Sequence, residues 1–167
     1  HNNLGIALQK LGENQKAISS YEKAIQIQPN HAIAHNNLGN VFEELGELQK
    51  AKSSYEKAIE INPSYAKVHD KLGIVLQKLG ELQKAKSCTE KAIEINPKYV
   101  SAHNNLGIVL QKLGENQKAI SSYEKAIQIQ PNHAMAYNNL GILFQDLGKI
   151  QKAINSYKMA AKYDPEN

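Results

Sequence analysis

The chain has 167 residues, enough for one ordinary domain or a short array of repeats, and its 41% hydrophobic and 22% charged residues are typical of a folded protein. No apolar run approaches the roughly 18–20 residues that a helix needs to span a bilayer, so we expect no membrane partner. The formal net charge is +4, yet all 20 basic residues are lysines interspersed with glutamates, and the absence of arginine, which forks onto phosphates and guanine edges, argues against a nucleic-acid partner.

A period of 34 residues runs through the whole chain and divides it into five repeats. A Leu-Gly pair and a closing proline each occur once per repeat. The glycines of the pair are Gly5, Gly39, Gly73, Gly107 and Gly141, and the prolines are Pro29, Pro63, Pro97, Pro131 and Pro165. We expect the repeats to span 1–31, 32–65, 66–99, 100–133 and 134–167. The first repeat is truncated at its start and the chain opens without a methionine, so we expect it to be a fragment of a larger protein.

Each repeat is predicted to fold as two helices, and the second repeat shows why. Apolar side chains recur at i, i+3, i+4 and i+7 within residues 38–45, which predicts a first helix with one apolar stripe. The stripe consists of Leu38, Val41, Phe42 and Leu45. Gly46 is expected to end that helix in a left-handed conformation. A second stripe spans residues 51–62 before Pro63 ends it, so the two helices form an antiparallel hairpin.

This pattern resembles the tetratricopeptide repeat family over essentially the whole chain. The resemblance rests on the Leu-Gly pair, a large apolar residue three positions further on, an Ala-x3-Tyr segment and the closing proline. It implies an all-α fold, an α-solenoid in which five hairpins stack into a right-handed superhelix. It also implies a protein-interaction scaffold whose concave face, lined by the first helices, holds a protein or peptide ligand. The sequence has no Gly-rich phosphate loop and no catalytic Ser-His-Asp or Cys-His grouping, so we expect neither an enzyme nor a cofactor.

Two positions depart from the family pattern. The early tryptophan is replaced by His1, His35, His69 and His103, with Tyr137 in the last repeat. Equivalent residues of stacked hairpins lie about 8–10 Å apart, too far to share a zinc ion with ligands near 2 Å, so we interpret these histidines as packing residues and expect no metal site. Thr89 stands where the other repeats have tyrosine, and the loss of a buried ring predicts that the third hairpin is the softest. The single cysteine, Cys88, rules out an internal disulfide, which fits a cytoplasmic location.

A row of asparagines is expected on the concave face. The residues that we expect to contact a peptide are Asn3, Asn37, Asn40, Lys67, Lys71, Asn105 and Asn139. A carboxamide both donates and accepts hydrogen bonds, so such a row can pair with the backbone of an extended peptide. The row is similar to the asparagine ladder in the repeat region of O-GlcNAc transferases, and it is interrupted at Lys71. The other interpretation is that these asparagines are simply solvated.

A second kind of groove is less well matched. Chaperone-binding members of the family carry a carboxylate clamp, and Asn37, Lys67 and Lys71 match three of its five residues. Asn2 and Ile6 stand where the clamp needs a lysine and an asparagine. We therefore favour the asparagine row over the clamp.

Three functions remain open from the sequence. The first is a scaffold that binds an extended peptide on its concave face. The second is a substrate-recruiting region of a larger enzyme, such as a glycosyltransferase. The third is a structural repeat that self-associates through its uncapped, apolar ends.

Overall fold

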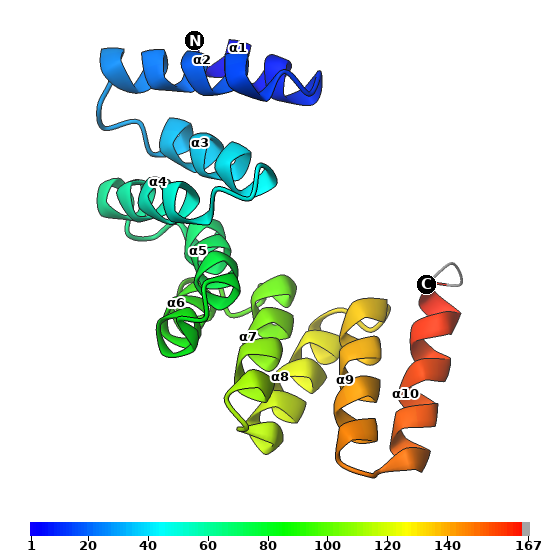
Figure 1. Cartoon of the computed structure of the whole chain (residues 1–167). Helices are drawn as coiled ribbons and strands as arrows, with labels where there is room; N and C mark the ends of the chain where they lie inside the picture. The colour runs from blue at the N-terminus through cyan, green and yellow to red at the C-terminus, as the bar shows by residue number, and fades with distance from the viewer. Residues whose placement is uncertain (165–167) are drawn as a thin grey trace. The chain divides into compact units, whose positions relative to one another are not determined.

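Residues 1–164 of the computed structural model are described, and they form ten α-helices and no β-strand (Figure 1). In chain order the helices are α1 (Asn2–Lys10), α2 (Asn14–Ile27), α3 (Ala32–Glu44), α4 (Leu48–Ile61), α5 (Ala66–Lys78), α6 (Leu82–Ile95), α7 (Val100–Lys112), α8 (Asn116–Ile129), α9 (Ala134–Asp146) and α10 (Ile150–Tyr163). Two helices fall in each repeat, which confirms the prediction of an all-α repeat solenoid. Pro165, the last of the recurring prolines, lies outside the described residues.

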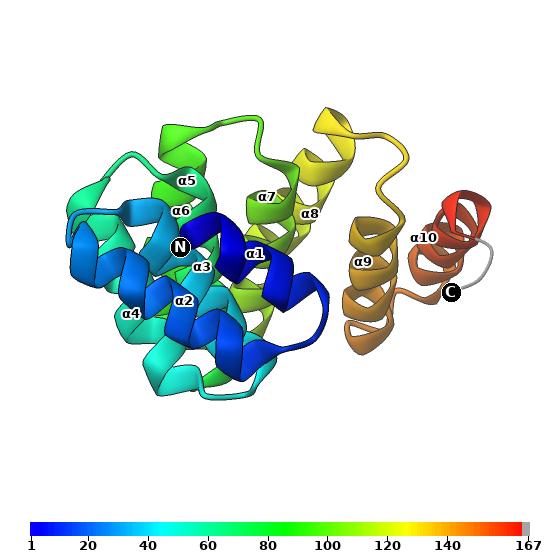
Figure 2. The same ribbon diagram turned by 90° about the horizontal axis from the view of Figure 1, so that it is seen from above.

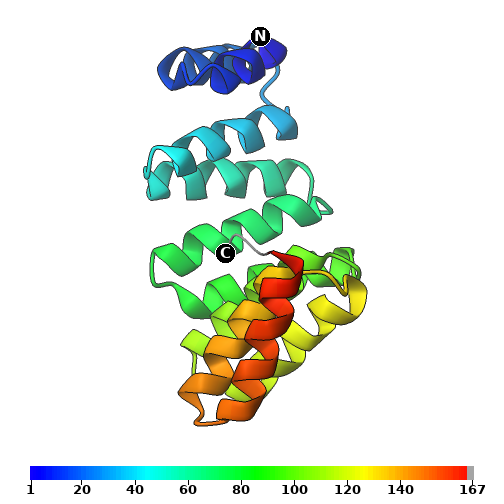
Figure 3. The same cartoon turned by 90° about the vertical axis from the view of Figure 1, so that its right-hand side faces the viewer.

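The helices group into two compact units, His1–Glu81 with α1–α5 and Leu82–Asn167 with α6–α10. In the first unit, the α3–α4 hairpin stacks directly on the α1–α2 hairpin (Figure 3). In the second unit, α9 and α10 lie side by side (Figure 2). The division falls between the two helices of the third repeat, the repeat that carries Thr89.

A left-handed glycine ends the first helix of each pair, as predicted. Gly46 has a φ of +74°, and Gly12, Gly80, Gly114 and Gly148 have φ values between +69° and +79°. The Glu47 N–H then donates to the Phe42 carbonyl at 2.8 Å, which satisfies a carbonyl at the end of α3. Leu45 differs from the prediction because it is 44% exposed. Helix α3 ends at Glu44, so Leu45 is the C-cap residue and leaves the buried stripe.

A tyrosine ring packs against the glycine of the Leu-Gly pair inside each hairpin that carries both. In the second repeat, a methyl group added to Gly39 would lie 2.6 Å from Cε1 of Tyr55. Tyr55 itself is fully buried. The glycine is therefore required by the close approach of the ring rather than by its backbone conformation. In the third repeat, Thr89 is buried and its hydroxyl donates to the Ala85 carbonyl at 2.9 Å, within α6.

Three of the four histidines at the tryptophan position, His35, His69 and His103, contact the backbone of the preceding loop. The Nε2 atoms of His69 and His103 lie 2.9 Å from the carbonyl oxygens of Pro63 and Pro97, and the His35 ring makes the same contact. His69 and His103 are buried. These contacts bear out the interpretation of the histidines as packing residues that connect neighbouring hairpins.

Candidate functional site

The predicted contact residues lie on the first helices of the repeats. In the first unit, Asn3 lies on α1, Asn37 and Asn40 on α3, and Lys67 and Lys71 on α5; in the second unit, Asn105 lies on α7 and Asn139 on α9. Asn3 and Lys67 are exposed, whereas the other five are half-buried. We call the surface that carries these side chains the amide face of each unit.

The asparagines of the amide face bind one another between repeats. The Asn37 Nδ2 donates to the Asn2 Oδ1 at 3.2 Å, and the Asn139 Nδ2 donates to the Asn104 Oδ1 at 3.0 Å. Each bond joins residues that are 35 positions apart. Because a carboxamide has two N–H donors, each donor asparagine keeps one N–H that this bond does not use. The row is therefore part of the stacking between repeats, and its contact with a ligand stays a prediction.

This ladder is interrupted at Lys71, as the sequence indicates, and the consequence is visible at Asn36. Asn36 is only 5% exposed, and its Oδ1 has no hydrogen-bond partner within the described residues. It is the repeat counterpart of Asn2 and Asn104, whose Oδ1 atoms both accept from the next repeat. The Lys71 ammonium lies instead 6.0 Å from the centroid of the Tyr55 ring. Burial lowers the pKa of Lys71, and the carboxylate of Glu43 opposes this shift.

Asn40 and Lys78 also have partners within the first unit. The Tyr55 hydroxyl lies 2.9 Å from the Asn40 Oδ1 and 3.0 Å from the Glu43 Oε2. The Lys78 Nζ lies 2.7 Å from the Glu43 Oε1. The Lys78 ammonium is therefore paired with a carboxylate of the preceding repeat.

A second recurring arrangement on the amide face links a tyrosine, a glutamine and a carboxylate; we call it the relay. In the first unit, the Tyr21 hydroxyl donates to the Gln9 Oε1 at 3.0 Å, and the Gln9 Nε2 donates to the Glu44 Oε1 at 2.8 Å. Burial, and secondarily the charge of Glu44, raises the pKa of Tyr21. The hydroxyl therefore stays protonated at neutral pH and orients the glutamine with its N–H groups toward the carboxylate.

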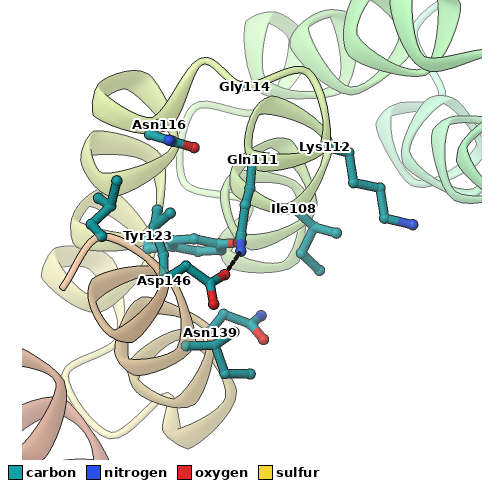
Figure 4. A pocket seen from close by; sticks show the side chains of 11 residues that line it. Ile108, Gln111, Lys112, Gly114, Asn116, Tyr123, Asn139 and Asp146 are labelled. Atoms are coloured by element: carbon teal, nitrogen blue, oxygen red, sulfur yellow. Dashed lines mark hydrogen bonds between the residues drawn. The ribbon is translucent and has the colours of Figure 1, made fainter.

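The same relay occurs in the second unit. The Tyr123 hydroxyl donates to the Gln111 Oε1 at 3.1 Å, and the Gln111 Nε2 donates to the Asp146 Oδ2 at 3.3 Å (Figure 4). Burial raises the pKa of Tyr123. Its ring lies beside the end of the Gln111 side chain in Figure 4 and is fully buried.

The relay of the second unit borders a pocket of about 560 Å³. Residues of α7, α8 and α9 and of the loops that follow α7 and α9 line it, including Asn139, Gln111 and Asp146. Its apolar lining includes Ile142 and Leu147, which are 41% and 36% exposed. The pocket thus combines an exposed apolar surface with a carboxylate and a carboxamide, as ligand pockets commonly do.

The relay and its pocket were not predicted from the sequence. The signal was present, because tyrosine follows glutamine or glutamate by 12 positions in every repeat except the third. That spacing places the two residues on different helices of one hairpin, so neither helical periodicity nor a local motif reveals the contact. The carboxylate comes from the next repeat, which made the group harder to recognise.

Residues 1–164 contain neither a cluster of metal-ligating side chains nor a membrane-spanning helix. No group of three or more histidine, cysteine, aspartate or glutamate residues is arranged to hold a metal ion there. No helix in this part of the chain is long and apolar enough to cross a membrane.

Comparisons with known proteins agree with this architecture. Two family models described as tetratricopeptide repeat match the chain, one over residues 1–64 and 99–166 and the other over residues 66–99. A crystal structure of MamA is 28% identical in sequence, with a TM-score of 0.88 over 97% of this chain and 95% of that chain. The crystal structure of YrrB, described as a TPR protein with an unusual peptide-binding site, is 26% identical, with a TM-score of 0.80 over 99% of this chain and 86% of that chain.

A third solved structure shows the same fold at lower identity. PilF from Pseudomonas aeruginosa is 23% identical, with a TM-score of 0.88 over 99% of this chain and 76% of that chain. The comparison with curated proteins finds no match.

Proposed function

Because the chain belongs to the tetratricopeptide repeat family, we propose that it binds an extended peptide segment of a partner protein on its amide face. Proteins of this family are generally non-catalytic scaffolds, and membership of the family supports a role in protein interaction. The more specific proposal concerns the site and the ligand. It takes the amide face as the concave surface that the family resemblance implies.

The observation that carries the proposal is the pocket beside Asn139. An extended peptide presents backbone N–H and C=O groups together with side chains that point alternately to opposite sides. Asn139 keeps one N–H after its bond to Asn104, which suits a backbone carbonyl. The exposed side chains of Ile142 and Leu147 suit one apolar side chain of the peptide. The peptide-binding site that is described for YrrB gives the proposal a precedent on the same fold.

The test uses a pair of isoleucines that differ in position but not in exposure. Ile142 and Ile154 are each 41% exposed, and only Ile142 lines the pocket. Peptides would first be selected from a random display library on the immobilised chain, and their dissociation constants would be measured by fluorescence anisotropy. Ile142→Ser removes apolar contact worth about 1–2 kcal/mol, so binding should weaken roughly 5–30-fold.

Ile154→Ser is the matched control, and it should leave the dissociation constant unchanged. Circular dichroism would verify that both variants keep their helical content. The proposal is wrong if the library yields no peptide that binds the chain, or if the two variants lose affinity equally.

A further inference from the structure

We infer that the relay gives the amide face a preference for peptides that carry a basic side chain next to an apolar one. This inference rests on the proposed function, because it specifies the chemistry of the same peptide. The preference is assigned to the carboxylates of Asp146 and Glu44. It is carried by the hydrogen-bond geometry of the relay, the exposure of the carboxylates and the duplication of the arrangement.

Asp146 is exposed, and its carboxylate is held in place rather than neutralised. The Gln111 amide donates one hydrogen bond to it, at 3.3 Å, and Tyr123 fixes the direction of that amide. Within the described part of the chain, no lysine lies within ion-pair distance of Asp146. Lys112 also lines the pocket, but in Figure 4 its side chain extends away from Asp146. A carboxylate has about four lone-pair sites, so most of its acceptor capacity is left for a ligand.

The apolar part of the pocket suits an apolar residue of the peptide next to the basic one. Ile142 and Leu147 are exposed beside Asp146, on the same helix and at its C-cap. A lysine or arginine has an aliphatic stem that packs on such a surface while its charged end reaches a carboxylate. An apolar residue next to it in the peptide would cover the rest of the exposed surface.

The first unit repeats the relay, although Asn40 stands at the repeat position of Ile142. Residues 1–31 and 103–133 are identical except that Ala7 is matched by Val109, so the tyrosine and the glutamine of the relay are duplicated. The carboxylate comes from the following repeat, where Glu44 stands at the position of Asp146. Glu44 is exposed, accepts a hydrogen bond from Gln9 at 2.8 Å, and is not bridged by a lysine among the described residues. The carboxylate is thus present twice although the two residues differ.

The carboxylate of Glu43, in contrast to those of Glu44 and Asp146, already has a cationic partner within the chain. It accepts from the Tyr55 hydroxyl, and the Lys78 ammonium neutralises it at 2.7 Å. A basic peptide side chain would have to displace Lys78 to bind there. The net charge of +4 moreover repels basic peptides in general, so a preference for them has to come from local carboxylates that are not neutralised.

The experiment compares short capped peptides of glycine and serine that differ at one central residue. The three peptides carry Ile-Lys, Ile-Gln or Ile-Glu at the centre, and binding to the whole chain would be followed by amide NMR titration. An exposed ion pair is worth about 0.2–1 kcal/mol, so the Ile-Lys peptide should bind about 1.5–5-fold more tightly than the Ile-Gln peptide. The Ile-Glu peptide should bind more weakly than both.

The variant that tests the assignment is Glu44→Gln combined with Asp146→Asn. It should bind the Ile-Lys and Ile-Gln peptides equally. Its control is Glu22→Gln combined with Glu124→Gln, which changes two exposed glutamates outside the relay and alters the net charge by the same amount. The control should keep the difference between the peptides.

The outcomes separate the two proposals. Equal binding of the Ile-Lys and Ile-Gln peptides to the unmodified chain would overturn the preference while leaving peptide binding in place. A difference that persists in the Glu44→Gln, Asp146→Asn variant would overturn the assignment to these carboxylates. If none of the peptides shifts the resonances of Ile142 and Gln111, while library peptides also fail to bind, the proposed function itself is wrong.

Discussion

Replacing Lys71 by asparagine should stabilise the protein, although the substitution removes a side chain from a packed helix face. The hydrogen bonds from Asn37 to Asn2 and from Asn139 to Asn104 show how an asparagine at this position behaves. An asparagine at position 71 would place its Nδ2 next to the Asn36 Oδ1, which has no partner in the described chain. The substitution therefore completes the interrupted ladder.

The expected magnitude sets one main gain against two smaller losses, and removal of the burial penalty on the Lys71 charge adds to the gain. Satisfying a buried acceptor recovers about 1–3 kcal/mol. The contact of the Lys71 ammonium with the Tyr55 ring, at 6.0 Å, is worth about 0.5–1 kcal/mol. Asparagine is also a poorer helix former than lysine by a few tenths of a kcal/mol. The net stabilisation is about 1 kcal/mol, which corresponds to a rise of roughly 2–4 °C in Tm for a chain of this size.

Thermal unfolding followed by circular dichroism gives the Tm, and hydrogen exchange at the amides of α3 and α5 shows whether the gain is local. Lys67→Asn is the control, because Lys67 is exposed on the same helix and its replacement completes no hydrogen bond. Burial lowers the pKa of Lys71, so folding penalises its charged form. That penalty fades as the pH rises toward the ordinary lysine value, and the advantage of Lys71→Asn should shrink in parallel. A Tm equal to that of the Lys67→Asn variant, or below it, would refute this account of Asn36.

Three further predictions follow from the packing and the titration of buried groups. Gly39→Ala should lower the Tm, because its methyl group would lie 2.6 Å from the Tyr55 ring; with Tyr55 replaced by threonine, the same change should raise the Tm through helix propensity. Burial raises the pKa of Tyr21, Tyr55 and Tyr123, so their contribution to stability is fully present below the unfolded pKa of 10.0. The free energy of unfolding should therefore fall as the pH rises above this value, and tyrosinate absorbance would follow the unfolding. Burial lowers the pKa of His133, so stability should fall as the pH drops below 6.5, and His133→Gln should reduce that fall in a series of urea titrations.

The hairpins were predictable because their signals act locally. Gly46 ends a helix through its own backbone conformation, and Pro63 limits the helix before it through its ring. Apolar residues at helical spacing identify the buried side of each helix without reference to any other repeat. The exposure of Leu45 was not predicted, because the spacing of apolar residues indicates which side of a helix is buried but not the residue at which the helix ends.

Contacts between repeats were not predictable in the same way. The ladder and the relay join residues that are 35 positions apart, one more than the period, so counterparts at the 34-residue spacing are not the residues that meet. A carboxamide can hydrogen-bond to a neighbouring carboxamide or to the backbone of a peptide. The presence of asparagines in a row therefore does not show which of these two partners they bind. Thr89 and Lys71 were recognised from the sequence as exceptions to the repeat pattern. That the buried Asn36 Oδ1 has no hydrogen-bond partner among the described residues was visible only in the structure.

The chemistry of the amide face is decided at the junction between two repeats rather than within one. A single repeat position carries lysine in three repeats and an acidic residue in two, namely Lys10, Glu44, Lys78, Lys112 and Asp146. The effect of this residue depends on the residue 35 positions earlier. Where that residue is glutamine, the following carboxylate is oriented and remains open to a cation. Where it is Glu43, the following lysine closes an ion pair and removes both charges from the face. The two kinds of junction therefore differ at both positions, and a closed junction needs a glutamate in one repeat and a lysine in the next. Through that pairwise dependence, an array of nearly identical repeats can acquire distinct binding positions.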